Sequence, residues 1–493
     1  MPVAAARLRR SGRCAVRRAA YDVAMPVVAG VDSSTQSTKI EIRDYDTGSL
    51  IASASSPHPP VVPPRSEQPP SAWWSAFEDA WSRLGSPHVD AIAVAGQQHG
   101  LVALDADRAV IRPAKLWNDT ESAPDAGWLI KQFAGGAAAW ADAVGSVPVA
   151  SLTVSKLSWL HRSEPQSWER LRHVLLPHDW MTMQLSGEMT TDRGDASGTG
   201  YWSPATGEYR WDLLDIVDSS IDWVDVVPQV LAPLDVAGEW NGAAVAAGTG
   251  DNMAAALGLG LVPGDVVVSL GTSGTVYCVS ETPTRDATGA IAGFADATGR
   301  FLPLACTLNA TKVTEMAGRL LGVDFDELDR LALAGEPGSK GLTLLPYLDG
   351  ERTPNRPKAT GVLSGLRSDV SREQFSRAAF ESVACSLHDA YLALVAACGS
   401  QNGRVFLVGG GSRSLAYRQI VAHVFGRSLT IPHDDQVVAA GAAVQAAAAL
   451  TQTDPMEIAK RWGLGEGTVV EPPDLADFDA HPYSRLRDAT LEW

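Results

Sequence analysis

Two segments about half the chain apart place small hydroxyl and glycine residues between apolar runs. In the first, Val27–Val31 and Lys39–Ile42 flank Asp32–Thr38, and in the second, Val266–Leu270 leads into Gly271–Thr275. Each pattern predicts a strand, a tight turn and a second strand. Because turn amides and hydroxyls donate to phosphate oxygens and glycine permits close backbone approach, the repetition predicts a duplicated nucleotide-phosphate site. Either segment alone fits an ordinary hairpin equally well.

A carboxylate suited to proton transfer follows a later strand pattern. The segment Ala247–Asn252 places glycines before Asp251, so this side chain can project from the end of a strand. An aspartate there can accept a proton from an attacking hydroxyl, and in phosphoryl transfer such a base mainly orients the nucleophile. The alternative is an aspartate that only stabilises a turn.

Side chains that can hydrogen-bond a polyol follow another strand pattern. Gln98 and His99 come directly after the apolar run Ala91–Ala95, and open α/β sheets bind ligands at the carboxyl ends of their strands. The segment Leu116–Asp119 adds a ring, an amide and a carboxylate. A histidine in this position can also be purely structural, so the segment alone leaves both interpretations open.

Tryptophan is unevenly distributed. Thirteen of the fifteen tryptophans lie at or before Trp240. Since aromatic rings pack against the C–H faces of sugars, this asymmetry favours the N-terminal half as the substrate side, although most of these rings are expected to lie in the core.

Three glycines near the C-terminus follow the strand pattern Val405–Val408. Gly409–Gly411 and the next residues, Ser412–Ser414, predict a flat backbone platform that leads into a helix N-terminus, which suits a nucleoside or its phosphates. The alternative is a glycine-rich turn without a ligand. The spacing matches neither the dinucleotide-binding fingerprint nor the P-loop, so both folds lose support.

Length and composition set the class of protein. The chain has 493 residues, 45% of them hydrophobic and 20% charged, which predicts two or more globular domains. A net charge of −17 argues against nucleic acid or an anionic membrane as a partner. Five scattered cysteines without a Cys-x-x-Cys pair suit reduced thiols in a cytoplasmic protein. We find no apolar run long enough to predict a membrane-spanning helix.

The first 24 residues differ from the rest of the chain. They carry six arginines and one acidic residue, and they lack the apolar core of a secretory signal. Met25 stands directly before the first strand pattern. We therefore expect residues 1–24 to be a disordered extension or the product of a mis-assigned start codon, with an organellar targeting peptide as the alternative.

Strand patterns alternate with helical patterns from Val27 onward, which predicts α/β layers with a mixed sheet. We expect an N-terminal domain over residues 25–242 and a C-terminal domain over residues 243–493, joined at a hinge near 235–242. The expected helices begin near Ser71 and lie around 121–143, 155–162, 178–186, 311–321, 325–334, 372–398 and, as the last, 436–450.

Together these segments resemble the FGGY family of carbohydrate kinases, and among them the xylulokinases, in order from about Val27 to Leu450. Gly361–Leu366 with Gln374–Glu381 looks like the family's C-terminal signature, and Ser151–Leu160 is similar to the N-terminal one, from which Ser163 departs. The segments that look specifically like xylulokinases are Gly96–Gly100, Leu116–Asp119, Asp195–Thr199 and Gly350–Pro354.

The resemblance implies two actin-like, ribonuclease H-like ATPase domains that flank a central cleft, with the sugar on the N-terminal side. It implies that Asp251 is the base and that Asp32 holds Mg²⁺ through water. The implied sugar ligands are Gln98, His99, Asp119, Asp251 and Asn252. The implied ATP ligands are Ser34, Thr35, Thr38, Gly271, Thr272, Ser273, Gly410, Gly411 and Ser414.

The activity implied by the resemblance is ATP-dependent phosphorylation of D-xylulose to D-xylulose 5-phosphate in pentose catabolism, with ATP and Mg²⁺, by a cytoplasmic protein. Related kinases are often homodimers. Gln98 stands where xylulokinases often have methionine, which leaves ribulose, gluconate or glycerol open as the substrate; Ser412 stands where alanine is frequent. An actin-like or heat-shock-chaperone-like ATPase that acts on a protein partner is an alternative from a different class.

Overall fold

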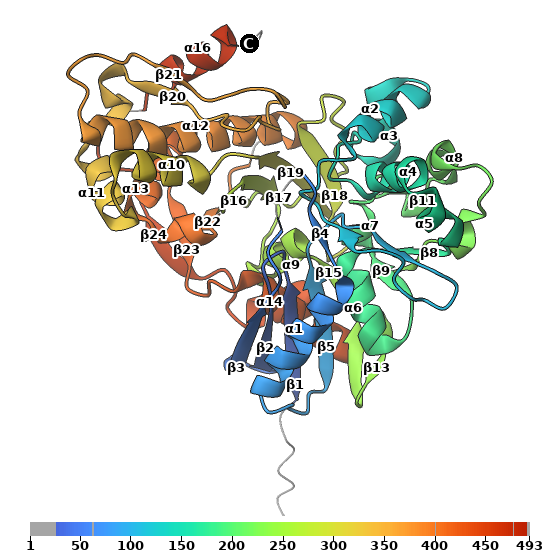
Figure 1. Cartoon of the computed structure of the whole chain (residues 1–493). Helices are drawn as coiled ribbons and strands as arrows, with labels where there is room; N and C mark the ends of the chain where they lie inside the picture. The colour runs from blue at the N-terminus through green and yellow to red at the C-terminus, as the bar shows by residue number, and fades with distance from the viewer. Residues whose placement is uncertain (1–25, 62–63, 400, 477, 491–493) are drawn as a thin grey trace, which may run out of the picture.

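The computed structural model describes residues 26–61, 64–399, 401–476 and 478–490, so the expected extension over residues 1–24 lies outside the described residues. Figure 1 shows two sheet-containing parts, with helices α9 (Asp251–Gly258) and α14 (Val437–Thr451) between them. Among the described helices, none combines the length and the hydropathy needed to cross a membrane.

The N-terminal sheet has seven strands in the order β13-β14-β5-β1-β2-β3, with β15 beside β5. Its first three strands in sequence are antiparallel, whereas β5 runs parallel to β1 and β14 runs parallel to β5. The strands are β1 Val27–Ser33, β2 Ser37–Asp44, β3 Leu50–Pro57, β5 Ala91–Gly96, β13 Val236–Trp240, β14 Ala243–Ala246 and β15 Thr249–Gly250.

The C-terminal sheet repeats this order as β18-β19-β17-β16-β22-β23-β24. The hairpin β16-β17 is antiparallel, and β22 and β23 continue the sheet in parallel from β16, as β5 and β14 do from β1. The repetition confirms the expected pair of mixed sheets that each begin with a hairpin. The strands are β16 Val266–Leu270, β17 Gly274–Cys278, β18 Ile291–Ala295, β19 Phe301–Thr307, β22 Val405–Val408, β23 Leu429–Pro432 and β24 Gly467–Val470.

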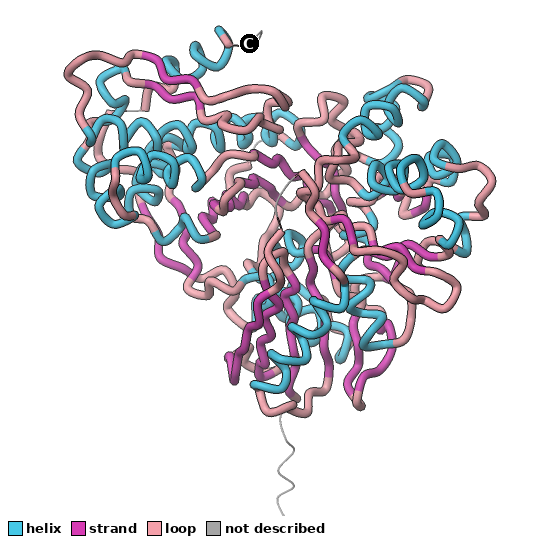
Figure 2. The backbone as a smooth tube through the Cα atoms, viewed as in Figure 1, coloured by secondary structure: helices cyan, strands magenta, loops and turns pink. Residues whose placement is uncertain are grey.

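Figure 2 shows helices gathered at the upper left and at the upper right, with others beside the strands of the lower part. The expected helices 311–321, 325–334 and 372–398 are confirmed as α10, α11 and α12, but the expectation that 436–450 is the last helix is wrong, because α15 and α16 follow it. The α-helices other than α9 and α14 are α1 Pro70–Arg83, α2 Ala123–Gln132, α3 Gly136–Val144, α4 Thr153–Ser163, α5 Pro165–Arg170, α6 Pro177–Ser186, α7 Arg193–Ala196, α8 Trp211–Val217, α10 Thr311–Leu321, α11 Phe325–Ala334, α12 Arg372–Cys398, α13 Leu415–Phe425, α15 Pro455–Arg461 and α16 His481–Ala489.

Within the described residues, five short two-stranded sheets lie outside the two large sheets. These pairs lie in the parts of the chain that carry no long apolar run, and their two- or three-residue strands escape prediction from periodicity. They are β4 Glu67–Gln68 with β7 Ala114–Lys115, β6 Val102–Leu104 with β8 His173–Leu175, β9 Thr190–Asp192 with β12 Gln229–Leu231, β10 Trp202–Ser203 with β11 Glu208–Tyr209, and β20 Thr343–Leu345 with β21 Val362–Ser364.

Helix α14 joins the two sheets into one core, although it comes late in the chain. One hydrophobic cluster contains residues of β1, β5, β16 and β22 together with α9 and α14. A Cβ built on Gly30 of β1 would lie 2.0 Å from the Ala439 carbonyl oxygen, and one built on Gly258 would lie 1.9 Å from that of Val437. The helix therefore packs directly against backbone. The expected domain boundary at 242/243 falls between β13 and β14, which pair in the N-terminal sheet.

We expect Gly441→Ala in α14 to lower the free energy of unfolding by about 1–3 kcal/mol, because the new methyl group would lie 1.9 Å from the carbonyl oxygen of Ala254. Thermal unfolding of the ligand-free protein measures the effect. Gly127→Ala in α2 is the matched control, since nothing lies within 4 Å of its added Cβ and alanine favours helix. Equal melting temperatures for the two variants would contradict the packing argument.

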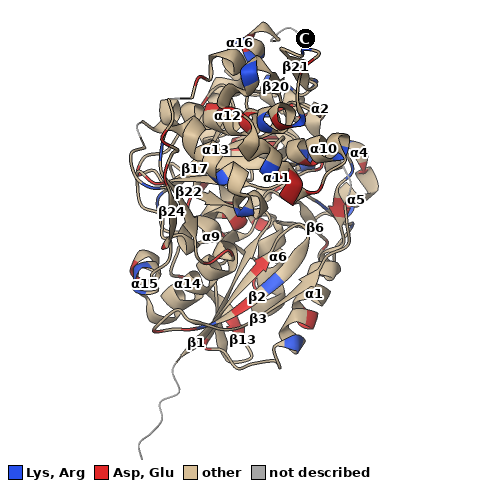
Figure 3. Ribbon diagram, turned by 90° about the vertical axis from the view of Figure 1, so that its left-hand side faces the viewer, with Lys and Arg blue, Asp and Glu red and all other residues tan. Residues whose placement is uncertain are grey.

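Charged residues of both signs are interspersed over the face that Figure 3 shows, including α11 and α12.

Candidate functional site

The strand register brings the expected base and the expected metal-holding aspartate to one edge of the N-terminal sheet. Asp32 of β1 and Thr249 of β15 both pair with Ala95 of β5. Asp251 begins α9 directly after β15, and Gln97 directly follows β5. The carboxyl ends of three neighbouring strands therefore place both aspartates and the Gln97–His99 segment side by side.

The surroundings of the two aspartates disfavour their ionised forms and so raise the pKa of each. Burial, opposed by Lys39, raises the pKa of Asp32 to about 7. Burial, together with the negative charges of Asp32 and Asp195, raises the pKa of Asp251 to about 7 as well. The Oδ1 atom of Asp32 is buried and has no hydrogen-bond partner among the described residues. A carboxylate in this condition fits a divalent cation, and Mg²⁺ takes oxygen ligands.

We expect catalytic activity to fall as the pH is lowered through about 7, since a carboxylate accepts a proton only in its ionised form and burial raises the pKa of Asp251 to about 7. A cation beside Asp32 favours ionisation and moves the midpoint downward. The measurement is kcat/KM for the sugar between pH 5 and 9 at saturating Mg-ATP. A profile that stays flat down to pH 5 would contradict Asp251 as the base.

Unsatisfied polar atoms gather around the residues that follow β5. The Asn252 side-chain amide donates to Gln98 Oε1 at 2.9 Å and to Asp251 Oδ1 at 3.0 Å, which links the three residues. Gln98 is 4% exposed and His99 is 7% exposed. Their Nε2 and Nδ1 atoms, like Gln97 Nε2, are buried without a well-formed hydrogen bond among the described residues, although Gln98 lies near Asp195 and His99 near the Gly198 amide. Buried polar groups are normally paired, so these atoms indicate a place for a ligand.

His99, one of the expected sugar ligands, has an uncommon backbone conformation. Its φ is +64°, its ring lies 5.2 Å from that of Phe294, and its carbonyl oxygen accepts from Thr153 Oγ1 at 3.2 Å. Burial first, and then the charges of Lys156 and Arg352, lower the pKa of His99 well below its usual range. The imidazole is therefore neutral near pH 7 and can both donate and accept.

The first hairpin turn presents Ser34 and Thr35 but buries Thr38. Thr35 Oγ1 donates to Gln97 Oε1 at 3.3 Å and accepts from Trp117 Nε1 at 2.9 Å, so the turn is tied to the expected sugar loops. Thr38 is fully buried, and its hydroxyl lies 2.8 Å from His58 Nε2. The structure thus places Thr38 beneath the turn.

The second hairpin turn and the glycine-rich loop emerge at one edge of the C-terminal sheet. Ser269 of β16 pairs with Val408 of β22, so the turn Gly271–Ser273 and the loop Gly409–Gly411 lie beside each other. A Cβ on Gly410 would meet nothing within 4 Å, which leaves its backbone open. A short 3-10 helix, η3 (Gly410–Arg413), then leads into α13.

Ser414 is occupied as the N-cap of α13. Its hydroxyl accepts from the Tyr417 amide at 3.0 Å and donates to Asp329 Oδ1 at 2.7 Å. The cap satisfies one of the free N–H groups of the helix N-terminus, so the side chain supports the loop.

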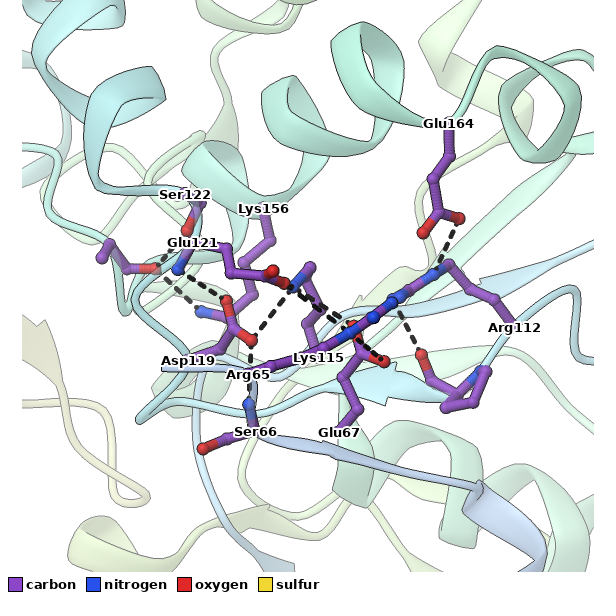
Figure 4. Close-up of polar contacts among 12 residues, drawn as sticks. Arg65, Ser66, Glu67, Arg112, Lys115, Asp119, Glu121, Ser122, Lys156 and Glu164 are labelled. Carbon is purple, nitrogen blue, oxygen red and sulfur yellow. Dashed lines mark hydrogen bonds and ion pairs between the residues drawn. The ribbon is translucent and has the colours of Figure 1, made fainter. Parts of the chain in front are cut away.

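Asp119 lies in an ion cluster that Figure 4 shows. Its carboxylate accepts from Lys115 Nζ at 3.0 Å, from the Ser66 amide at 3.0 Å and from the Glu121 amide at 3.0 Å. Lys115 is fully buried and also contacts Glu67 at 3.3 Å. These contacts hold the segment around Trp117, and the role of Asp119 as a sugar ligand stays a prediction.

A buried histidine behind the site was missed in the sequence. His178 of α6 is fully buried, and its Nδ1 lies 2.7 Å from Asp195 Oδ2 and 3.3 Å from Asp179 Oδ1. Burial opposes its charge, but the carboxylates of Asp179 and Asp195 raise its pKa to about 10. Glycines 96 and 248 make room for it, since a Cβ on either would come within 2.7 Å of the His178 side chain. Those glycines were the available signal.

Comparisons with known proteins agree over most of the chain. The model of the N-terminal domain of the FGGY family of carbohydrate kinases matches residues 27–258, and that of the C-terminal domain matches residues 266–450. A xylulose kinase of Streptomyces coelicolor is 46% identical over 472 residues, which cover 94% of this chain and 95% of that protein. One of Escherichia coli is 33% identical over 81% of this chain and 85% of its own.

A solved structure supports the same grouping. The crystal structure of the xylulose kinase from Bifidobacterium adolescentis has a TM-score of 0.81 and 40% sequence identity, and the match covers 94% of this chain and 99% of that chain. Two mixed sheets that each begin with a glycine- and hydroxyl-rich hairpin turn, and two aspartates at one edge of the N-terminal sheet, define a sugar kinase with two ribonuclease H-like, actin-like domains. The chain belongs to the FGGY family of carbohydrate kinases. As a member, it acts on a small sugar and on ATP.

Proposed function

We propose that the chain transfers the γ-phosphoryl group of ATP to the terminal hydroxyl of D-xylulose, giving D-xylulose 5-phosphate and ADP. The observation that carries this proposal is the 46% identity to the Streptomyces coelicolor xylulose kinase across nearly the full length of both chains. The buried, unpartnered amide and imidazole atoms of Gln98 and His99 support it, because they suit the hydroxyl and carbonyl oxygens of a ketose.

Asp251 is the base in the proposed mechanism. It accepts the proton of the terminal hydroxyl while that oxygen attacks the γ-phosphorus, and in a loose transition state its main contribution is to orient the nucleophile. The backbone N–H of Asn252 donates to Asp251 Oδ1 at 2.8 Å, which fixes the carboxylate at the first turn of α9. Gln98 and His99 bind the remaining oxygens of the sugar.

The phosphates of ATP are held by both hairpin turns in this proposal. Ser34 and Thr35 contribute from the N-terminal sheet and Gly271–Ser273 from the C-terminal sheet, while Gly410 and Gly411 border the adenosine. Thr38 and Ser414 support these loops from within. Asp32, whose Oδ1 is unpartnered, would hold Mg²⁺ through water. When bound, Mg²⁺ would offset the negative charge that develops on the phosphates.

The test is ADP release by the purified protein with Mg-ATP and a panel of D-xylulose, D-ribulose, L-ribulose, L-xylulose, gluconate and glycerol. We expect strong preference for D-xylulose and loss of turnover when EDTA removes the metal. Preference for another sugar would keep the mechanism and point to Gln98 as the residue that changed the specificity. Turnover that ignores every sugar and rises with a protein partner would favour the partner-directed ATPase instead.

The assembly and location follow as part of the same proposal. We expect a homodimer in the cytoplasm; the four described cysteines, which are all free, suit a reducing compartment. Sedimentation at several protein concentrations checks the oligomeric state.

A further inference from the structure

Arg352 extends from the C-terminal part of the chain toward the N-terminal part, which carries the expected sugar ligands Gln98 and His99. It is half-buried, and its Nη1 lies 3.4 Å from Ser151 Oγ, which precedes α4. The guanidinium is also close enough to His99 to contribute, after burial and Lys156, to the low pKa of that imidazole. The contact with Ser151 therefore places the guanidinium at the start of the segment whose Thr153 hydroxyl donates to the His99 carbonyl oxygen at 3.2 Å.

The charge of Arg352 has no carboxylate partner. Within the described part of the chain, none of the ion pairs involves its guanidinium, whereas Arg112, Arg377 and Arg404 all pair with acidic residues. A guanidinium has five N–H donors and no acceptor, so it needs several acceptors around it. Ser151 Oγ and the Cys306 side chain supply two contacts, which leaves further donors for a ligand.

The backbone that carries Arg352 is fastened to the second phosphate hairpin. Glu351 is 1% exposed, and its carboxylate accepts from the Leu308 amide at 2.6 Å, from Asn309 Nδ2 at 2.8 Å and from the Arg352 amide at 2.8 Å. The next residue, Ala310, donates its amide to the Thr272 carbonyl oxygen at 3.1 Å. A short run of hydrogen bonds thus connects the guanidinium to the turn Gly271–Ser273.

We infer that Arg352 is a sugar-binding residue which donates to the carbonyl or hydroxyl oxygens of the ketose from the C-terminal side, and that it couples sugar binding to the phosphate hairpin. This inference rests on the proposed function and deepens it. A sugar held between His99 and Arg352 brings the two parts of the chain together. Because the arginine is fastened to the hairpin through Glu351, the phosphates of ATP are placed correctly only when a sugar is present.

The test compares Arg352→Lys and Arg352→Gln with the wild type, using whichever sugar the wild-type panel selects. We expect KM for the sugar to rise about 10- to 100-fold, as the loss of a hydrogen bond from a charged donor predicts. The KM for ATP should stay within about threefold of the wild-type value. The stimulation of ATP turnover by sugar should fall in the variants, most in the one whose KM for the sugar rises most. Millimolar guanidinium ions should partly restore the KM of Arg352→Ala.

Lys358→Gln is the matched control, because it removes one positive charge from an exposed position of the same loop. It should leave both KM values unchanged. The inference is overturned if both Arg352→Lys and Arg352→Gln keep the KM for the sugar and the stimulation by sugar within twofold of wild type. A lowered melting temperature with an unchanged KM would also overturn it, because that result indicates a purely structural arginine. The wild-type panel tests the proposed substrate separately, so failure of one leaves the other standing.

Discussion

Asp251→Asn is expected to lower kcat by about 10²- to 10⁴-fold, because an amide cannot accept the proton of the attacking hydroxyl. The substitution keeps the size of the side chain and the contact with Asn252, so affinity for Mg-ATP should remain close to that of the wild type. ADP release under saturating sugar and ATP measures the loss, and ATP binding by calorimetry measures what is retained. Near-normal turnover in this variant would remove Asp251 from the role of base.

The stability of the same variant separates lost chemistry from lost folding. The pKa of Asp251 is raised to about 7 by burial and by Asp32, so the ionised carboxylate costs free energy in the folded protein above that pH. We therefore expect ligand-free Asp251→Asn to melt at a higher temperature than the wild type at pH 8. A lower melting temperature would show that the lost activity reflects damage to the fold.

His178→Gln is expected to lower the free energy of unfolding by about 3–5 kcal/mol, because it leaves the buried carboxylates of Asp179 and Asp195 without their cation. The folded-state pKa of His178 is about 10 against an ordinary value of 6.5. The stabilisation is thus fully present below pH 6.5 and is lost as the pH rises through about 10. Denaturant unfolding of both proteins at pH 6, 8 and 10 follows it.

The control for this prediction is His161→Gln. His161 also lies near a carboxylate, 3.7 Å from Asp218, but its side chain is 43% exposed, so its loss should cost less than about 0.5 kcal/mol. If the two histidine variants unfold at the same denaturant concentration, the charge of His178 does not hold the carboxylates together.

The fold was predictable where apolar runs are long or glycine punctuates them. Helix α12 runs over its expected residues because a capping box at Ser371 and a glycine at position 399 mark both ends. The hairpins at Asp32 and Gly271 were predictable because small residues interrupt strong strand patterns. The two-residue strands β4 and β7 were not, since their pairing depends on the ion cluster around Lys115 rather than on local preference.

Within the candidate site, residue types were easier to predict than what each side chain does. Asp32 and Asp251 were found because glycine and hydroxyl residues surround them. Asp119 is the example: its position beside Trp117 suggested a sugar ligand, the structure adds contacts with Lys115 and two amides, and its role toward a sugar stays a prediction. His178 was missed because its charge depends on Asp195, which is distant in sequence and close only in the fold.

The packing of α14 on the N-terminal sheet means that order along the gene and order in space differ. Gly30 and Gly258, which precede α14 by about 400 and 180 residues, leave room for a helix that is synthesised near the end. A polypeptide cut after residue 258 would carry an uncovered apolar face. During translation that face stays uncovered until α14 has left the ribosome. The N-terminal sheet therefore cannot complete its hydrophobic core before most of the C-terminal part has been synthesised.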